Sequence, residues 1–246
     1  MGNPTRNSAL AASYDERAAT YRTFGNGSLL DVLVEVLPPG GSVLDIGCAS
    51  GGLLAGIKDH AGRRVGLEIS ETAAKAAREV ADDVIVGDIA DPELSRGVEG
   101  FDVVVLADVL EHTAEPAEAL EQALRFCAPG GRVVISVPNV AHWQVRKGLL
   151  RGHWDYVESG VLDRGHLRFF TLATIVAEVT AAGLVVERVN GIIPRLRNHV
   201  PGVVRLPKRM SGAAERAWQR FGERRLPMMA FQFIVVARLP EASNAP

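Results

Sequence analysis

Short runs of apolar residues recur along the chain and alternate with stretches of helical spacing. Seven runs rich in valine and isoleucine contain few polar residues, as expected for strands covered on both faces of a sheet. They are residues 42–46, 64–68, 83–87, 101–107, 132–137, 184–189 and 231–238. Helices fit between or beside them at 28–37, 51–60, 70–80, 116–127 and 171–182. This alternation predicts an α/β fold with a doubly wound, mostly parallel sheet and right-handed crossovers.

The same pattern divides the chain into segments. Helical spacing over 28–37 stops at Pro38-Pro39-Gly40-Gly41, which is typical of a helix end. We therefore expect an N-terminal helical cap (1–38), a main domain (39–190 and 230–239), an insertion before the last strand (191–229) and a disordered tail (240–246). A connection as long as 191–229 is usually functional or mobile.

The first predicted strand ends in a glycine-rich turn, DIGCASGG, which covers residues 45–52. In doubly wound sheets, ligands bind beyond the carboxyl ends of the strands, and glycines let a ligand approach the backbone closely. A dinucleotide fingerprint competes as an interpretation, because Gly47, Ala49 and Gly52 loosely match its spacing. Asp45 argues against it, since a carboxylate at this place would repel a pyrophosphate. The turn suits a cationic ligand without phosphate.

Three more predicted strands end in acidic residues. Glu68 lies 23 residues after Asp45, where a carboxylate can accept both hydroxyls of a ribose. Asp88 can accept from an adenine amino group while Ile89 packs on the ring, and Asp108 follows the fourth strand. Each acid alone is more often a solvated loop residue or a helix cap. Four of them at successive strand ends indicate a site for a positively charged nucleoside.

The motifs VLDIGCASGGLL, VGLEIS, VGDI, FDVVVLADVLEH and PGGRVVISVPN resemble, in order and spacing, those of class I S-adenosylmethionine-dependent methyltransferases. The resemblance spans about residues 40–190 and implies a Rossmann-like seven-stranded sheet with an antiparallel last strand and helices on both faces. It also implies S-adenosylmethionine as the cofactor and S-adenosylhomocysteine as the product. The chain departs from the usual pattern at Ala49, where the family has glycine.

The resemblance assigns cofactor contacts residue by residue. The expected binding residues are Tyr14, Tyr21, Asp45, Gly47, Ala49, Gly51, Glu68, Ile69, Asp88, Ile89, Ala107 and Asp108. Tyr14 and Tyr21 are similar to aromatic lid residues that close over the cofactor, although packing of an N-terminal helix would explain them equally well.

Residues 138–171 resemble one branch of the family, which includes MetW-like proteins and methyltransferases of bacterial glycan and natural-product pathways. Methyl transfer requires alignment of the reacting atoms, and a hydroxyl acceptor also needs a proton acceptor. The candidates are His142, His166 and His112, with Asp108 as an orienting or accepting carboxylate. Each histidine could instead be structural, and an uncharged amine acceptor would need no base. We expect no metal site, because a trio of Asp108, Glu111 and His112 at a helix start is more simply a cap and dipole arrangement.

Composition excludes several classes of protein. Of the 246 residues, 47% are hydrophobic and 23% are charged, which is typical of a globular chain. No apolar run is long enough to cross a membrane, and the N-terminus shows no secretory signal. The two cysteines, Cys48 and Cys127, have no metal-binding spacing. We therefore expect a cytoplasmic protein without structural zinc.

The charge is unevenly distributed. Residues 192–226 contain nine basic and two acidic residues, a local charge of +7, which leaves −9 for the rest of a chain with net charge −2. A helix over 211–222 could present this charge. Four interpretations stay open: an anionic or phosphate-bearing substrate, a homodimer contact, a membrane surface, or a plain solvated surface. Nucleic acid is not an expected partner, because no reading motif is present.

Three functions follow as hypotheses. The first is methyl transfer to oxygen or nitrogen of a small molecule, in bacterial natural-product or glycan biosynthesis. The second is a MetW-like protein that binds the cofactor and acts by partnering another enzyme. The third is an NAD-dependent oxidoreductase, against which Asp45 and the absence of a Tyr-x-x-x-Lys motif argue.

Overall fold

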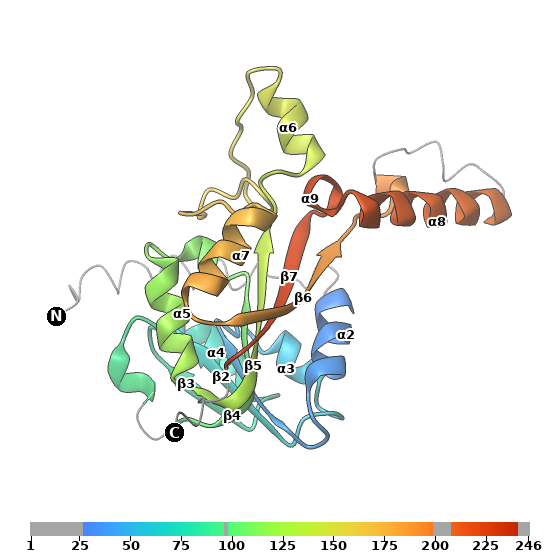
Figure 1. The fold of residues 1–246 in the computed structure, drawn as a ribbon. Coiled ribbons are helices and arrows are strands. Elements are labelled where there is room, and N and C mark those ends of the chain that lie inside the picture. The colour runs from blue at the N-terminus through green and yellow to red at the C-terminus, as the bar shows by residue number, and fades with distance from the viewer. Residues whose placement is uncertain (1–26, 96–97, 199–207, 241–246) are drawn as a thin grey trace, which may run out of the picture.

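The computed structural model describes residues 27–95, 98–198 and 208–240, which form a seven-stranded sheet with helices on both faces (Figure 1). The strands are β1 (Ser42–Ile46), β2 (Arg63–Glu68), β3 (Asp83–Val86), β4 (Phe101–Ala107), β5 (Cys127–Pro138), β6 (Val185–Ile192) and β7 (Gln232–Arg238). Their order is β3-β2-β1-β4-β5-β7-β6. The strands β1 to β5 pair in parallel, and β7 runs antiparallel to both β5 and β6. The predicted fold class is confirmed.

Six of the helices lie close to predicted places, whereas α6 and α9 were not predicted. They are α2 (Gly27–Val36), α3 (Gly52–Gly56), α4 (Glu71–Ala77), α5 (Pro116–Leu124), α6 (Trp143–Leu149), α7 (Leu172–Ala181), α8 (Lys208–Arg224) and α9 (Leu226–Met229), with 3₁₀ turns η1 (Pro92–Ser95), η2 (Leu110–His112) and η3 (Leu196–Asn198). Ser70 caps α4 by accepting from the Ala73 amide, and Thr171 caps α7 by accepting from the Thr174 amide. The prediction of a helix over 51–60 is too long, because the glycines at both ends of α3 disfavour helix.

Two apolar layers cover the two faces of the sheet. Side chains alternate between the faces along β4: Val103 and Val105 pack with α2, α3 and α4, while Val104 and Leu106 pack with α5 and α7. All four are fully buried. This double coverage explains why the strands read as continuous apolar runs rather than as alternating ones.

Strands β1 to β5 point their carboxyl ends toward one edge of the sheet, and α6 and α8 extend outward from that edge (Figure 1). Because β7 is antiparallel, it begins at this same edge, where Gln232 pairs with Pro138 and Ile192. We call it the ligand edge, since ligands of doubly wound sheets bind there.

The helix predicted within the basic insertion is present as α8. Trp218 donates its indole N–H to the Pro194 carbonyl at 2.8 Å, and the Glu215 carboxylate accepts from the Leu196 amide at 3.1 Å. These contacts hold α8 against the chain that leaves β6.

Several expectations concern residues outside the described ranges. Tyr14 and Tyr21 lie there, together with most of the N-terminal cap and the tail, so those assignments stay predictions. The helix α2 occupies the end of the predicted cap. Within the described residues, every helix is too short or too polar to cross a membrane.

Candidate active site

The turn between β1 and α3 has the backbone of a close ligand-binding loop. Gly47, Ala49 and Gly51 have φ angles of 72°, 48° and 79°, in the left-handed region that glycine adopts without strain. A side chain on Gly51 would lie 2.6 Å from Val80. Ala49 has a side chain in this left-handed conformation, so its backbone is strained at the position where the sequence departs from the family pattern.

Glu68, at the end of β2, holds this turn in place. Its carboxylate accepts from the backbone amides of Ala49 at 2.8 Å and Ser70 at 2.9 Å. The side chain is buried, so these bonds are shielded from water. Glu68 positions the turn between β1 and α3, a role that the sequence analysis missed. Its expected contact with a ribose stays a prediction.

Asp45, at the end of β1, is buried beside the turn. The residue is 2% exposed, and among the described residues its Oδ1 atom has no hydrogen-bond partner. Burial, and secondly the negative charge of Glu68, raise the pKa of Asp45 to about 8. A buried carboxyl group without a partner is costly unless a ligand supplies a donor. The position suits the ammonium group of a cationic ligand.

The residues expected around an adenine ring lie along the same edge. Asp88 accepts from the Ala90 amide at 3.0 Å and is half-buried, as is Ile69. Ile89 packs against one apolar layer and Ala107 against the other, and both side chains are partly buried. The topology thus brings all of these residues to the ligand edge, while their contacts with a cofactor stay predictions.

Asp108 directly follows β4 in a left-handed conformation, with φ 54°. Its Oδ1 accepts from the Gln232 side-chain amide at 2.5 Å and from the Ser136 hydroxyl at 3.4 Å. Burial raises the pKa of Asp108 to about 6, and side-chain hydrogen bonds with Gln232, Ser136 and Glu111 oppose the rise. Strained residues of this kind cluster at functional sites. The sequence analysis did not name Gln232. The signal for it was its place at the start of the last strand, because an antiparallel strand begins at the edge where the parallel strands end.

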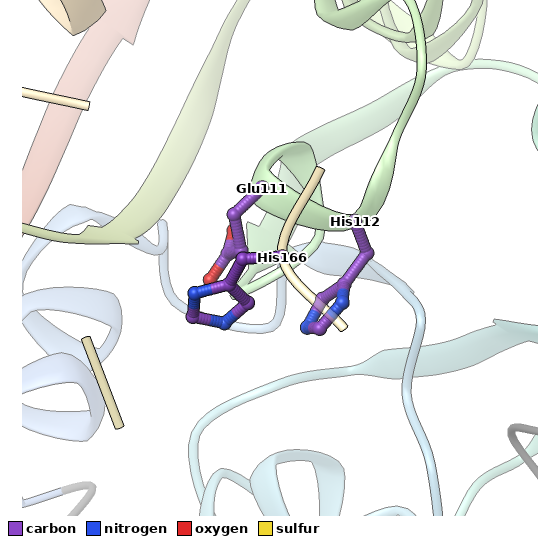
Figure 2. A group of neighbouring side chains, drawn as sticks. All are labelled: Glu111, His112 and His166. Atoms are coloured by element: carbon purple, nitrogen blue, oxygen red, sulfur yellow. The ribbon is translucent and has the colours of Figure 1, made fainter. Parts of the chain in front are cut away.

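A loop before α7 folds back onto η2. The amides of Leu167 and Arg168 donate to the Glu111 carbonyl at 2.7 and 3.0 Å. This docking places the ring of His166 4.9 Å from that of His112, centroid to centroid, with Glu111 beside them (Figure 2). Burial, and next the charge of Asp108, raise the pKa of Glu111 well above its ordinary value.

The predicted cap and dipole arrangement of Asp108, Glu111 and His112 is wrong for the cap, although Glu111 lies in the first turn of η2 and His112 in its last. The N-cap of η2 is Val109, and no side chain of the described residues hydrogen-bonds there. Glu111 turns into the protein instead and is 1% exposed.

His142 lies in a different setting from the other two candidate histidines. It precedes α6, is 1% exposed and packs against the rings of Trp143 and Phe231, each 5.8 Å away between centroids. Asn139, fully buried just before it, donates to the carbonyls of Pro227 and Ala230. Asn139 thereby ties the end of β5 to the start of β7.

Residues 16–189 match the family described as a methyltransferase domain. The chain is 31% identical over 169 residues to a ubiquinone biosynthesis O-methyltransferase of Thiobacillus denitrificans, covering 62% of this chain and 68% of the relative. It is 33% identical to a bifunctional methionine biosynthesis protein MetXA/MetW of Rhodopirellula baltica, over 46% of this chain and 19% of the relative. The chain spans less than half the length of several curated relatives that it matches.

Among solved structures, a SAM-dependent methyltransferase from Archaeoglobus fulgidus aligns with a TM-score of 0.59 and 16% identity, over 86% of this chain and 91% of that one. At this identity the likeness concerns the fold alone. The family match, in contrast, covers most of the chain. The chain belongs to the methyltransferase domain family, whose members use S-adenosylmethionine as the methyl donor, and the predicted class is confirmed.

Proposed function

We propose that this chain binds S-adenosylmethionine at the ligand edge and transfers its methyl group to an oxygen or nitrogen atom of a small molecule. The observation that carries the proposal is the buried carboxylate oxygen of Asp45 beside the turn of residues 47–51, which has no hydrogen-bond partner in the described part of the chain. It fits a ligand with an ammonium group, which would favour the ionised carboxylate, whereas the pyrophosphate of NAD has no hydrogen-bond donor to offer it.

The remaining predicted contacts fit the rest of such a ligand. Glu68 and Asp88 offer acceptors at the ends of β2 and β3, and Ile69 and Ile89 offer apolar side chains next to them. Gly47, Ala49, Gly51 and Ala107 have small side chains or none, which would allow a ligand to approach the backbone closely. Tyr14 and Tyr21 belong to the proposal as lid residues on the strength of the family resemblance.

When bound, the cofactor supplies an activated methyl group, whose transfer leaves a neutral thioether. The chain must align the acceptor with that group, exclude water and accept a proton if the acceptor is a hydroxyl. We draw the proton acceptor from the four groups at the ends of β4 and β5 and in the loop before α7. They are Asp108, His112, His142 and His166.

The acceptor is proposed to be anionic, in a natural-product or glycan pathway. Arg216, Arg220 and Arg224 recur every four residues on α8, so they share one face of the helix, and all three are exposed. A row of positive charge on an arm at the ligand edge would attract a phosphate- or carboxylate-bearing molecule.

Ligand binding tests the proposal directly. The purified chain should bind S-adenosylhomocysteine in a calorimetric titration and should show no heat with NAD at the same concentration. Binding of NAD without binding of S-adenosylhomocysteine would reject the assignment. Formation of S-adenosylhomocysteine with hydroxyl- and amine-bearing acceptors, followed by chromatography, then identifies the acceptor class.

A second candidate function is favoured by the similarity to a MetXA/MetW protein. In that case the chain would bind the cofactor and act through a partner enzyme. Binding of S-adenosylhomocysteine without turnover of any acceptor, together with co-purification of a defined enzyme, would support this alternative.

A further inference from the structure

Three side chains with metal-ligating atoms meet where η2 contacts the loop before α7. One ligand atom from each of Glu111, His112 and His166 lies within 4.8 Å of the others (Figure 2). Glu111 and His112 are adjacent in the chain, whereas His166 comes from 54 residues further on. The docking of residues 167 and 168 on the Glu111 carbonyl helps to bring the third group in.

Both imidazole rings are oriented by the backbone. Nδ1 of His112 lies 3.1 Å from the Gly165 carbonyl, and Nδ1 of His166 lies 3.2 Å from the Val161 carbonyl. A carbonyl accepts, so Nδ1 of each ring carries the hydrogen and donates it. Nε2 is then the nitrogen with a lone pair in the neutral ring. Histidines that bind metals show this arrangement, in which the second nitrogen donates to a carbonyl or carboxylate.

Glu111 presents a buried carboxyl group to the two rings. The residue is 1% exposed, the carboxyl of Asp108 lies beside it, and among the described residues no basic side chain pairs with it. The nearby guanidinium of Arg168 is directed to the Ala114 carbonyl and the Glu115 carboxylate instead. A buried carboxyl group either stays protonated or pairs with a cation. A metal ion at this place would replace the proton of Glu111 and pair with its carboxylate.

We propose that Glu111, His112 and His166 bind one divalent transition-metal ion of the zinc class. Two imidazoles and one carboxylate form a donor set that selects such ions over magnesium or calcium. Ligand atoms about 2.0–2.2 Å from a metal lie roughly 3–3.5 Å from one another, so binding draws the three groups slightly together. Three protein ligands leave a coordination position for water or a substrate atom.

The proposed metal site goes beyond methyl transfer, because binding of the ion needs neither the cofactor nor an acceptor. It also changes the assignment of the histidines. His112 and His166 become ligands rather than proton acceptors, and Asp108 and His142 remain for that role.

Metal titration of the full chain, stripped beforehand with a chelator, tests the site. Co²⁺ serves as a spectroscopic probe and Zn²⁺ as a calorimetric one. We expect one Co²⁺ per chain with visible ligand-field bands, displaced by one equivalent of Zn²⁺. His166→Gln and Glu111→Gln should each weaken Zn²⁺ binding by about 10–100-fold. His60→Gln is the matched control, since His60 is exposed and lies in the loop after α3.

The wild-type chain alone can overturn the proposal, since absence of stoichiometric Co²⁺ binding rejects it whatever the variants do. Equal affinity of His166→Gln and the wild type rejects it too, as does an equal loss in His60→Gln. Circular dichroism and thermal unfolding identify variants that fail to fold, and His112→Gln then replaces them. S-adenosylhomocysteine binding on the same samples separates the two proposals: metal binding without it supports the site and rejects methyl transfer.

Discussion

Replacing Asp45 by asparagine should stabilise the unliganded protein and weaken its binding of cofactor. Asparagine has nearly the same shape but no charge that must be neutralised on burial. The carboxyl of Asp45 is buried, and its pKa rises from 3.8 to about 8 on folding. The folded state thus holds this proton more tightly than the unfolded state. The contribution of Asp45 to stability falls as the pH rises from about 4 to about 8.

The size of the effect follows from the difference between pH 7 and the ordinary pKa of an aspartate. At pH 7 the side chain of Asp45 is ionised in the unfolded chain and must bind a proton on folding. Because pH 7 lies about three units above the ordinary pKa, this protonation costs about 4 kcal/mol. Asp45→Asn removes this cost, so it should raise the melting temperature at pH 7 by roughly 10 °C. Near pH 4 the two proteins should differ little.

Cofactor binding should respond in the opposite direction. The ammonium of S-adenosylhomocysteine needs the ionised carboxylate, so wild-type affinity should rise about tenfold between pH 6 and pH 7. Asp45→Asn should lose about 10–100-fold in affinity, the value of a hydrogen bond to a charged group.

Thermal unfolding between pH 4 and pH 8, with and without S-adenosylhomocysteine, measures both effects. The difference in melting temperature between variant and wild type should grow with pH, while the shift caused by the ligand should shrink in the variant. A variant less stable than the wild type at pH 7 would show that Asp45 is ionised and paired in the folded chain. Equal ligand shifts in both proteins would remove Asp45 from the cofactor site.

Three further substitutions test other parts of the site. Ala49→Gly should stabilise the chain by about 0.5–1 kcal/mol in urea unfolding, because φ 48° strains alanine; a loss of stability would contradict the strain. Asn139→Ala should lower the free energy of unfolding by about 2–4 kcal/mol in the same assay, because it leaves buried backbone groups unpaired. A loss below about 1 kcal/mol would show that the Asn139 side chain does not hold the end of β5 to the start of β7. Asp108→Asn should lower methyl transfer to a hydroxyl acceptor about 10²-fold or more, while unchanged turnover would exclude it as the proton acceptor.

The strands and helix caps that could be predicted depend on residues that are close together in the chain. The run FDVVVLA becomes β4 over the predicted residues, because alternate side chains of a strand meet different apolar layers. Ser70 and Thr171 could be recognised as caps because a cap involves residues only three positions away. The length of α3 was overestimated, since the glycines within it were not weighed against its apolar spacing.

Part of the candidate site also followed from the chain alone. Residues that come directly after parallel strands must gather at one edge, so Asp45, Glu68, Asp88 and Asp108 could be grouped without coordinates. The sequence did not reveal that Glu68 accepts from two backbone amides, or that Oδ1 of Asp45 has no hydrogen-bond partner within the residues that the structure describes. Those states depend on how the turn after β1 closes over the end of β2.

The sequence by itself determined the sheet, most of its helices and the acidic ligand edge, because these depend on periodicity and on the direction of strands. Only the tertiary structure decided that His166 joins Glu111 and His112, and that Gln232 reaches Asp108. These pairs lie 54 to 124 residues apart. Their contact depends on how a loop docks and where an antiparallel strand begins, which spacing along the chain does not encode.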